Sequence, residues 1–253
     1  MYNTIQKAGI MKRLSAWLLD IILLVTLATG FIALLSNVLN MDERVQEVKE
    51  VYTRYEETYG IDFSVTTEQL AEMTEQEQNL YWEVAEILNE DEDANHAFMK
   101  FLSTMLLMLS LGIFGAFVIL EFAVPLLLKN GQTLGKKAFG IALMRKDSVK
   151  ITPFMLFVRS LLGKYTIETM IPVLLLVMLF FGFIGGEGLL IAGLFLLAQV
   201  IEPLVTRNKT AIHDLLACTV AVDMNTQMIF DTPEERDEYE EQLRKDRESR
   251  ADY

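Results

Sequence analysis

Residues 101–128 read FLSTMLLMLSLGIFGAFVILEFAVPLLL, and this stretch decides the class of fold. Glu121 is its only acidic or basic side chain. A helix needs about 20 apolar residues to cross the hydrocarbon core of a bilayer, and this stretch is longer than that. Because a backbone exposed to lipid must satisfy its own hydrogen bonds, we expect the stretch to form a membrane-spanning helix.

Three further stretches have the same character, and each carries one acidic side chain. They are residues 14–39 with Asp20, 165–186 with Glu168 and 188–206 with Glu202. The chain as a whole is 52% hydrophobic, above the usual share in soluble globular proteins. We therefore predict an all-α integral membrane protein with four transmembrane helices.

A cleaved signal peptide is the alternative interpretation of the first stretch. Basic residues precede it, and Ala28-Thr29-Gly30 resembles a cleavage site. The apolar run continues to Leu39, however, which is longer than a usual signal core. We favour a retained transmembrane helix.

The distribution of Lys and Arg predicts the orientation, because basic residues accumulate in cytoplasmic connections. Residues 1–13 hold three bases and no acid, and residues 129–164 hold eight bases and one acid. Residues 40–100 hold four bases and 17 acids. This pattern predicts a multi-pass protein of the plasma membrane with both termini in the cytoplasm and residues 40–100 outside.

The prediction divides the chain into four regions. They are 1–39, the N-terminus and first helix; 40–100, an acidic extracytoplasmic helical insertion; 101–230, helices two to four with the cytoplasmic connection 129–164; and 231–253, an acidic cytoplasmic tail. The tail has ten acids and five bases, a charge that repels nucleic acid.

The insertion carries helical signals of its own. Apolar and aromatic residues recur at helical spacing over 45–59 and again over 80–88. Thr66 with Gln69 and Thr74 with Glu77 have the spacing of capping boxes. The apolar stripes could recognise a ligand, but packing between two or three helices is the interpretation that we favour.

The cytoplasmic connection begins with GQTLGKKAFG at 131–140. A phosphate-binding loop is excluded, because only three residues separate Gly131 from Gly135 and Lys137 stands where that loop has Ser or Thr. Residues 141–144 and 149–151 flank a polar turn, which predicts a short hairpin. Thr152 as N-cap and Pro153 at the first helical position then predict the start of a helix. We expect residues 153–164 to lie on the membrane surface, with Arg159 and Lys164 reaching the lipid head groups.

Four segments together resemble the RDD family of membrane proteins. They are AGIMKRLSAWLLDIILL at 8–24, GQTLGKKAFGIALM at 131–144, the basic stretch 153–164, and RNKTAIHDLLACTVAV at 207–222. The arginine and two aspartates that name the family fall on Arg13, Asp20 and Asp214. One departure is Cys218, where the family pattern has glycine. The resemblance implies transport of an ion or a small ligand.

The acidic residues within the spans are the candidate ion or proton sites. Asp20 lies inside the bilayer, where an unpaired ionised carboxylate costs about 2.5–3.5 kcal/mol, so we expect a partner, a proton or a cation. Arg13 is about 10.5 Å away along the helix axis, too far for a simple contact. The alternative is that Asp20 only accepts hydrogen bonds from Arg13, from the 207–214 segment or from Lys136 and Lys137.

Proline accompanies the other three acids. Glu121 and Glu168 lie four residues before Pro125 and Pro172, and proline frees the helix carbonyl four residues earlier. Glu202 precedes Pro203, which in the same way frees the carbonyl of Gln199. A carboxylate beside a free carbonyl is a candidate oxygen site for Na⁺ or a protonation site. The simpler interpretation is that these prolines only kink the helices.

Enzymatic signatures are not found. The two histidines, His96 and His213, fall on opposite sides of the predicted membrane, and Cys218 is the single cysteine. We therefore expect no catalytic residues, no metal site and no cofactor. Two functions stay open: a transporter or cation/proton exchanger acting as a homo-oligomer in the lipid bilayer, and a membrane scaffold or accessory subunit whose outer helices bind a partner.

Overall fold

The computed structural model describes residues 5–128, 130–205 and 211–251. The described chain is mostly helical, with a single two-stranded sheet. It divides into two compact units. One unit comprises the chain up to Ala28 together with the chain from Ile113 onwards, and the other comprises Thr29–Gly112.

Within the described residues, three helices are long and apolar enough to cross a membrane. The first is α1, Ile10–Val38. The second runs over Glu92–Leu127 and consists of α5 (Glu92–Phe117), η1 (Val118–Ala123) and α6 (Val124–Leu127). The third runs over Pro153–Phe180 and consists of α8 (Pro153–Phe157), η2 (Val158–Met170) and α9 (Ile171–Phe180). The chain therefore has the helical membrane class that its sequence predicts.

The predicted fourth span coincides with α10, Gly186–Val205. Among the residues whose side chains are described, its apolar part runs over Gly186–Ala198. The fourth crossing stays a prediction.

The helix predicted to lie on the membrane surface is wrong as a separate element. Residues 153–164 continue into α9 without a break, as one helix that ends at Phe180. Arg159 does not reach the exterior, because its residue is only 1% exposed. The cause is a set of acidic partners from distant parts of the chain, which are described below.

The predicted hairpin is correct only as a local turn. Arg145 N–H donates to the Val149 carbonyl at 2.8 Å, and Met144 forms an isolated bridge with Lys150. The main partner of strand β1, Ile141–Arg145, is instead β2, Thr219–Asp223, which pairs with it antiparallel. The sequence prediction had missed β2, because its partner lies far away in the chain.

The two strands form the core of the first unit. Residues 141–144 and 219–222 are all buried. One face of the ribbon packs with Ala8 and Ala16, at the start of the chain and in α1. The other face packs with Ile5 and Ile229. The ribbon therefore holds the beginning of α1 beside segments from the second half of the chain.

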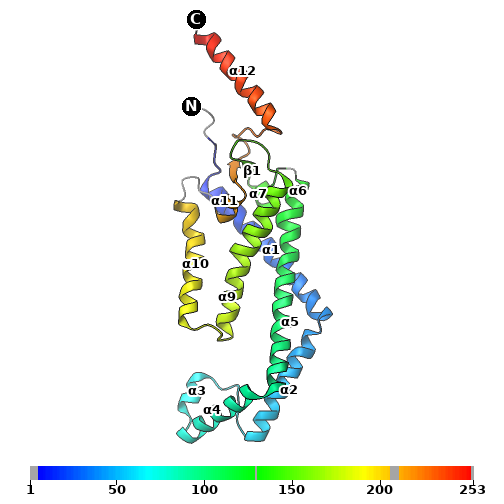
Figure 1. Cartoon of the computed structure of the whole chain (residues 1–253), viewed down its shortest axis with the longest axis vertical. Helices are drawn as coiled ribbons and strands as arrows, with labels where there is room; N and C mark the ends of the chain where they lie inside the picture. Colours follow the sequence, from blue (N-terminus) through cyan, green and yellow to red (C-terminus); the bar gives the residue numbers. More distant parts are fainter. Residues whose placement is uncertain (1–4, 129, 206–210, 252–253) are drawn as a thin grey trace. The chain divides into compact units, whose positions relative to one another are not determined.

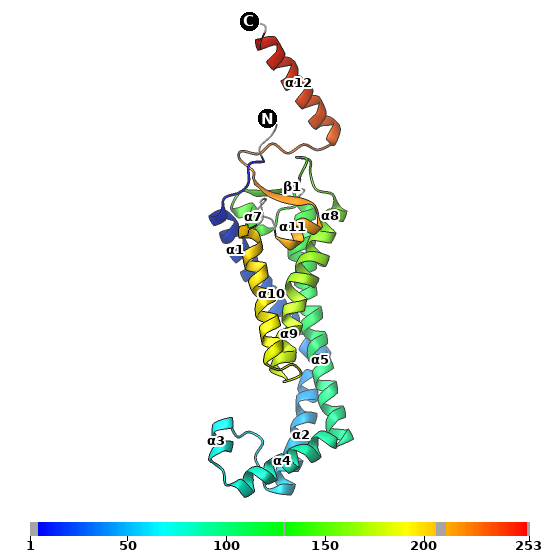
Figure 2. The same cartoon turned by 60° about the vertical axis from the view of Figure 1, so that its left-hand side comes forward.

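Two short helices, α7 (Leu134–Ala138) and α11 (Ile212–Leu216), complete this end of the unit. Figures 1 and 2 show β1, α7 and α11 at one end of the pair α9 and α10, with the turn that joins α9 to α10 at the other end. Helix α12, Pro233–Ala251, follows the ribbon and carries the acidic tail.

The second unit contains α2 (Met41–Tyr59), α3 (Thr67–Glu72), α4 (Glu75–Glu90) and the first part of α5. Both capping boxes are confirmed, at Thr66 and at Thr74. Phe63 joins the helices, since its ring lies 5.4 Å from that of Tyr52 and 5.6 Å from that of Tyr81. The helix-packing interpretation of the stripes is confirmed at Val84 and Leu88, both of which are buried.

Candidate functional site

Asp20 is bound by the short helix α7. Its carboxylate accepts a hydrogen bond from the Thr133 hydroxyl at 2.5 Å and one from Gly135 N–H at 2.8 Å. The Lys136 ammonium lies 4.0 Å from the same carboxylate. The side chains of Asp20 and Lys136 are 10% and 12% exposed, so this ion pair is largely removed from solvent. Lys136 was one of the partners expected from the sequence; Thr133 and Gly135 were not.

The glycines of GQTLGKKAFG explain how α7 reaches Asp20. Gly131 has a φ of +61°, a left-handed conformation that glycine adopts without strain. A Cβ atom on Gly135 would lie 2.2 Å from the Ala16 carbonyl oxygen of α1. Thr133 caps α7 by accepting a hydrogen bond from Lys136 N–H. The loop therefore places one backbone N–H group, that of Gly135, and the Thr133 hydroxyl directly against the Asp20 carboxylate.

Glu121 lies on η1 and is 5% exposed. Its Oε1 is 2.7 Å from the Lys164 ammonium, and its Oε2 is buried with no hydrogen-bond partner among the described residues. Its backbone carbonyl, the one that Pro125 leaves free in an α-helix, accepts a hydrogen bond from the Ser160 hydroxyl at 2.6 Å. The carboxylate and the backbone carbonyl of Glu121, which were predicted to form a cation site together, thus each have a donor from η2.

Arg159 and Asp214 form a buried ion pair. Arg159 Nε donates to Asp214 Oδ1 at 2.8 Å, and the two side chains are 2% and 1% exposed. Thr219, at the start of β2, donates a second hydrogen bond to the same oxygen at 3.0 Å. Arg159 Nη1 is buried and has no hydrogen-bond partner in the described part of the chain. Asp214 also attracts Arg13 electrostatically.

Glu168 binds the beginning of α11. His213 donates to its carboxylate twice, from the backbone N–H at 3.0 Å and from Nδ1 at 2.8 Å. A Cβ atom on Gly163 would lie 2.6 Å from the His213 Cβ, so α11 packs directly on η2. Gln199 and Glu202, the other two candidates from the sequence, have side chains outside the described residues.

The sequence prediction had missed the roles of Arg159 and Lys164 because it assumed an α-helix. In an α-helix, residues 159 and 164 would point about 140° apart around the axis, and residues 159 and 168 would point to opposite sides. η2 is a π-helix, in which residues four to five apart share a face. The spacing of Arg159, Lys164 and Glu168, five and then four residues, was the available signal.

Comparison with known families gives one result. The model of the RDD family matches residues 7–218. The chain belongs to the RDD family. Comparison with curated proteins and with solved structures finds no match.

The family match of this RDD protein includes Arg13, Asp20 and Asp214. The two aspartates lie in separate hydrogen-bond systems, Asp20 with α7 and Asp214 with η2 and β2. Lys136 acts electrostatically on both carboxylates. We call the set Asp20, Glu121, Lys136, Arg159, Lys164, Glu168, His213 and Asp214 the charged cluster.

The pKa values of the groups outside the spans follow from this arrangement. Burial acts to raise the pKa of Asp214, but Arg159 and His213 outweigh it and hold that pKa below its ordinary value. Burial, and after it the charge of Arg159, lowers the pKa of His213 against the attraction of Asp214 and Glu168. Burial, together with Lys164 and Arg159, lowers the pKa of Lys136 to about 7.

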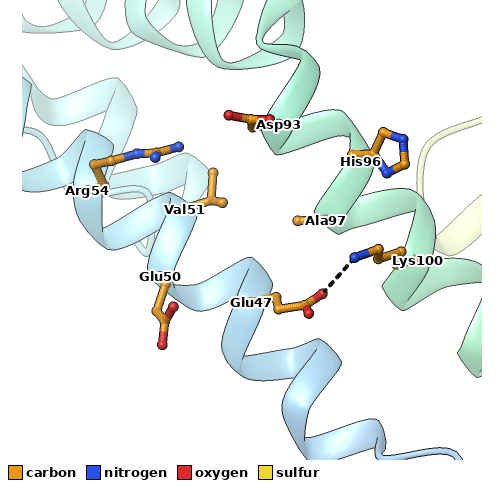
Figure 3. Close-up of a pocket in the computed structure, with 8 residues that line it drawn as sticks. All are labelled: Glu47, Glu50, Val51, Arg54, Asp93, His96, Ala97 and Lys100. Carbon is orange, nitrogen blue, oxygen red and sulfur yellow. Dashed lines mark ion pairs between the residues drawn. The ribbon is translucent and has the colours of Figure 1, made fainter.

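The second unit of this RDD protein has an open pocket of about 560 Å³ between α2 and α5 (Figure 3). Acidic and basic side chains mix around it, and Glu47 lies 3.8 Å from Lys100. Arg54, Asp93 and His96 there are exposed to solvent. No three His, Cys, Asp or Glu side chains come together to hold a metal ion anywhere in the described chain. The charged cluster, which is buried, is the stronger candidate site.

Proposed function

We propose that this RDD protein is a transporter that exchanges a monovalent cation for protons through the carboxylates of the charged cluster. The observation that carries the proposal is the burial of four acidic and four basic groups at one end of the spanning helices. Ionisable groups within membrane helices are costly, and ion and proton pathways are their usual role. Buried groups with shifted pKa values are also typical of functional sites.

Asp20 is the carboxylate that we place at the exchange step. It comes from a spanning helix, and a hydroxyl oxygen, that of Thr133, lies 2.5 Å from it. Carboxylate and hydroxyl oxygens are ligands that suit a hard monovalent cation. Lys136 balances the charge of Asp20 when no cation is bound.

A membrane scaffold is the second candidate, and one observation favours it. Within the described residues, Glu121, Glu168 and Asp214 have the protein's own bases as partners: Lys164, His213 and Arg159. If these pairs serve only to fix the fold, the protein has no exchange activity. The outer helices would then bind a partner.

The test is cation-dependent proton flux in reconstituted vesicles that contain a pH-sensitive dye. We expect a Na⁺ or K⁺ gradient to drive proton movement, and Asp20→Asn to reduce the rate by at least about tenfold. Loss of one charged ligand removes about 1.5–3 kcal/mol of binding, which corresponds to that factor or more. Asp147→Asn is the control, because Asp147 forms its ion pair with Arg145 on a surface turn.

Two outcomes decide between the candidates. Flux that falls with Asp20→Asn and persists with Asp147→Asn supports the exchanger. Absence of flux with Na⁺, K⁺ and Li⁺, with variants that are merely less stable, supports the scaffold. As an exchanger, we expect the protein to act in the plasma membrane as a homo-oligomer, without a cofactor and without nucleic acid.

A further inference from the structure

The two short helices that contribute to the charged cluster have an inverted distribution of polar and apolar side chains. In α11 the buried residues are His213 and Asp214, whereas Leu215 and Leu216 are 44% and 48% exposed. A helix on the surface of a soluble protein shows the opposite arrangement, with its apolar side chains towards the core. Ionisable side chains inside and apolar side chains outside are typical of a segment surrounded by lipid.

Helix α7 shows the same inversion. Its inward residues are Gly135, which is buried, and Lys136, whose side chain is 12% exposed. Leu134, and Phe139 directly after the helix, are exposed. Lys137 is exposed as well, but the four-carbon chain of a lysine lets its ammonium reach the lipid head groups from below them. The outer face of α7 is therefore also suited to lipid.

We propose that α7 and α11 lie within one leaflet of the membrane, the cytoplasmic one in the predicted orientation, and that the acyl chains of its lipids cover their apolar faces. We call Leu134, Phe139, Leu215 and Leu216 the lipid face. Both helices fall outside the spans that hydropathy predicts. The proposal applies to an exchanger and to a scaffold alike, because it concerns only the surface around the charged cluster.

The contact between α7 and α1 determines the depth. Gly135 N–H donates to Asp20 at 2.8 Å, and Asp20 lies about 15 Å beyond the start of α1 along the helix axis. With 29 residues, α1 is about 44 Å long, which exceeds the hydrocarbon core of about 30 Å by about 14 Å. Even with this whole excess on the cytoplasmic side, Asp20 reaches the hydrocarbon. α7 therefore meets α1 within the membrane.

Helix α11 meets the third spanning helix at a corresponding position. A Cβ atom on Gly163, ten residues beyond Pro153, would lie 2.6 Å from the His213 Cβ. Figure 2 shows α7 beside α1 and α11 beside the helix that begins with α8. On the spanning helices themselves, Trp17 and Leu162 are exposed apolar residues near these two contacts. The lipid-facing surface of the spanning helices thus continues onto α7 and α11.

The backbone of the two helices is compatible with a lipid environment, where each unsatisfied N–H group is costly. In α7, Gly135 N–H donates to the carboxylate on α1, and Lys136 N–H donates to the Thr133 hydroxyl. In α11, His213 N–H donates to the Glu168 carboxylate. The N–H groups at the start of each helix thus have partners inside the protein.

The experiment attaches a nitroxide spin label to single cysteines of the full chain in vesicles of phosphatidylcholine and phosphatidylglycerol. Leu134→Cys and Leu216→Cys probe the lipid face in a Cys218→Gly background. Leu176→Cys, at an exposed position of α9, is the lipid reference, and Thr226→Cys, in the exposed turn after β2, is the water reference. Collision rates are measured with oxygen, which concentrates in hydrocarbon, and with a polar nickel chelate present on both sides of the membrane.

The ratio of oxygen to nickel collision rates decides the outcome. For Leu134→Cys and Leu216→Cys it should exceed the ratio for Thr226→Cys at least about threefold, because excluding the chelate by only about 0.65 kcal/mol gives that factor. A ratio equal to that of the water reference overturns the proposal for the helix concerned. Low collision rates with both reagents overturn it too, because they indicate that a protein partner or a second copy of the chain covers the face.

A second measurement decides the question if a cysteine variant fails to fold. Phe139→Trp, combined with Trp17→Phe and Trp82→Phe, leaves one tryptophan, on the lipid face. Its fluorescence should be quenched by phospholipids with brominated acyl chains and not by iodide in the aqueous phase. Quenching by iodide alone overturns the proposal for α7.

Discussion

Gly135 is the point at which the backbones of α7 and α1 meet. A Cβ atom there would lie 2.2 Å from the Ala16 carbonyl oxygen and 2.8 Å from the Asp20 carboxylate. Because the nearest atom belongs to a backbone, the clash is relieved only by moving one of the helices. We expect Gly135→Ala to destabilise the protein by about 1–3 kcal/mol, the usual range for overpacking. Thermal unfolding in detergent measures the effect.

Gly30→Ala provides the matched control. Gly30 lies within α1, and a Cβ atom there would meet nothing within 4 Å. Alanine is favoured over glycine inside a helix, so this variant should be neutral or slightly more stable. Equal behaviour of the two variants would show that α7 does not approach α1 as described.

Cys218 lies in the turn between α11 and β2. Its φ is +53°, a left-handed conformation that a side chain disfavours and glycine adopts readily. The turn between α11 and β2, where the backbone reverses before β2 pairs with β1, therefore forms around a residue that carries a side chain.

At the level of elements, η2 determines how the charges meet. Its π-helical register brings Arg159 and Lys164 towards acids on two other elements, Asp214 of α11 and Glu121 of η1. π-Helical segments are rare and often accompany functional sites. A purely α-helical segment would turn one of these bases away from the cluster.

The Arg159–Asp214 pair predicts strong energetic coupling between η2 and α11. Removing one partner leaves a buried charge uncompensated, so Asp214→Asn should cost about 3–5 kcal/mol. The double variant Arg159→Met with Asp214→Asn should cost less than the sum of the single variants, by at least about 1 kcal/mol. Thermal unfolding of the four proteins gives the coupling.

The exposed pair Lys245–Glu241 is the control for that cycle. It joins residues four apart on α12 at 2.9 Å, and its coupling should be near zero. Additive costs at Arg159 and Asp214 would contradict the buried pair.

Because the pKa of Asp214 is lowered, the stabilisation of the fold by the Arg159–Asp214 pair is complete above the ordinary carboxyl pKa and is lost as the pH falls towards the lowered value.

At the level of the whole molecule, the orientation in the membrane follows from the basic connections and has a direct test. Cys218 is the single cysteine and is exposed. In intact cells we expect a membrane-impermeant maleimide to leave it unlabelled, because the predicted orientation places it on the cytoplasmic side. Ser64→Cys in a Cys218→Gly background should be labelled from outside, because Ser64 is an exposed residue of the predicted outer region.

Permeabilised cells provide the control for the labelling experiment. Both cysteines should react there, which shows that each is accessible in the folded protein. Labelling of Cys218 in intact cells would reverse the predicted orientation and would place the charged cluster at the outer side of the membrane.

Several features follow from local sequence and were predicted correctly. Hydropathy identifies the three helices that, among the described residues, are long and apolar enough to cross a bilayer. The capping boxes at Thr66 and Thr74 also follow from the sequence, because both partners lie within one helical turn. The need of Asp20 for a partner was also predicted, because an ionised carboxylate within an apolar stretch is costly when it is unpaired.

What the sequence by itself determined is thus the membrane class, the RDD family and the position of the acids along the helices. Only the tertiary structure decided which base each acid meets. Asp20 with Thr133 and Arg159 with Asp214 are joined across long stretches of chain, and no local rule predicts such pairs. The π-helical conformation of η2 also depends on tertiary contacts. It replaces the usual α-helical hydrogen bonds and brings Arg159 and Lys164 against buried acids. The charged cluster is therefore a product of packing.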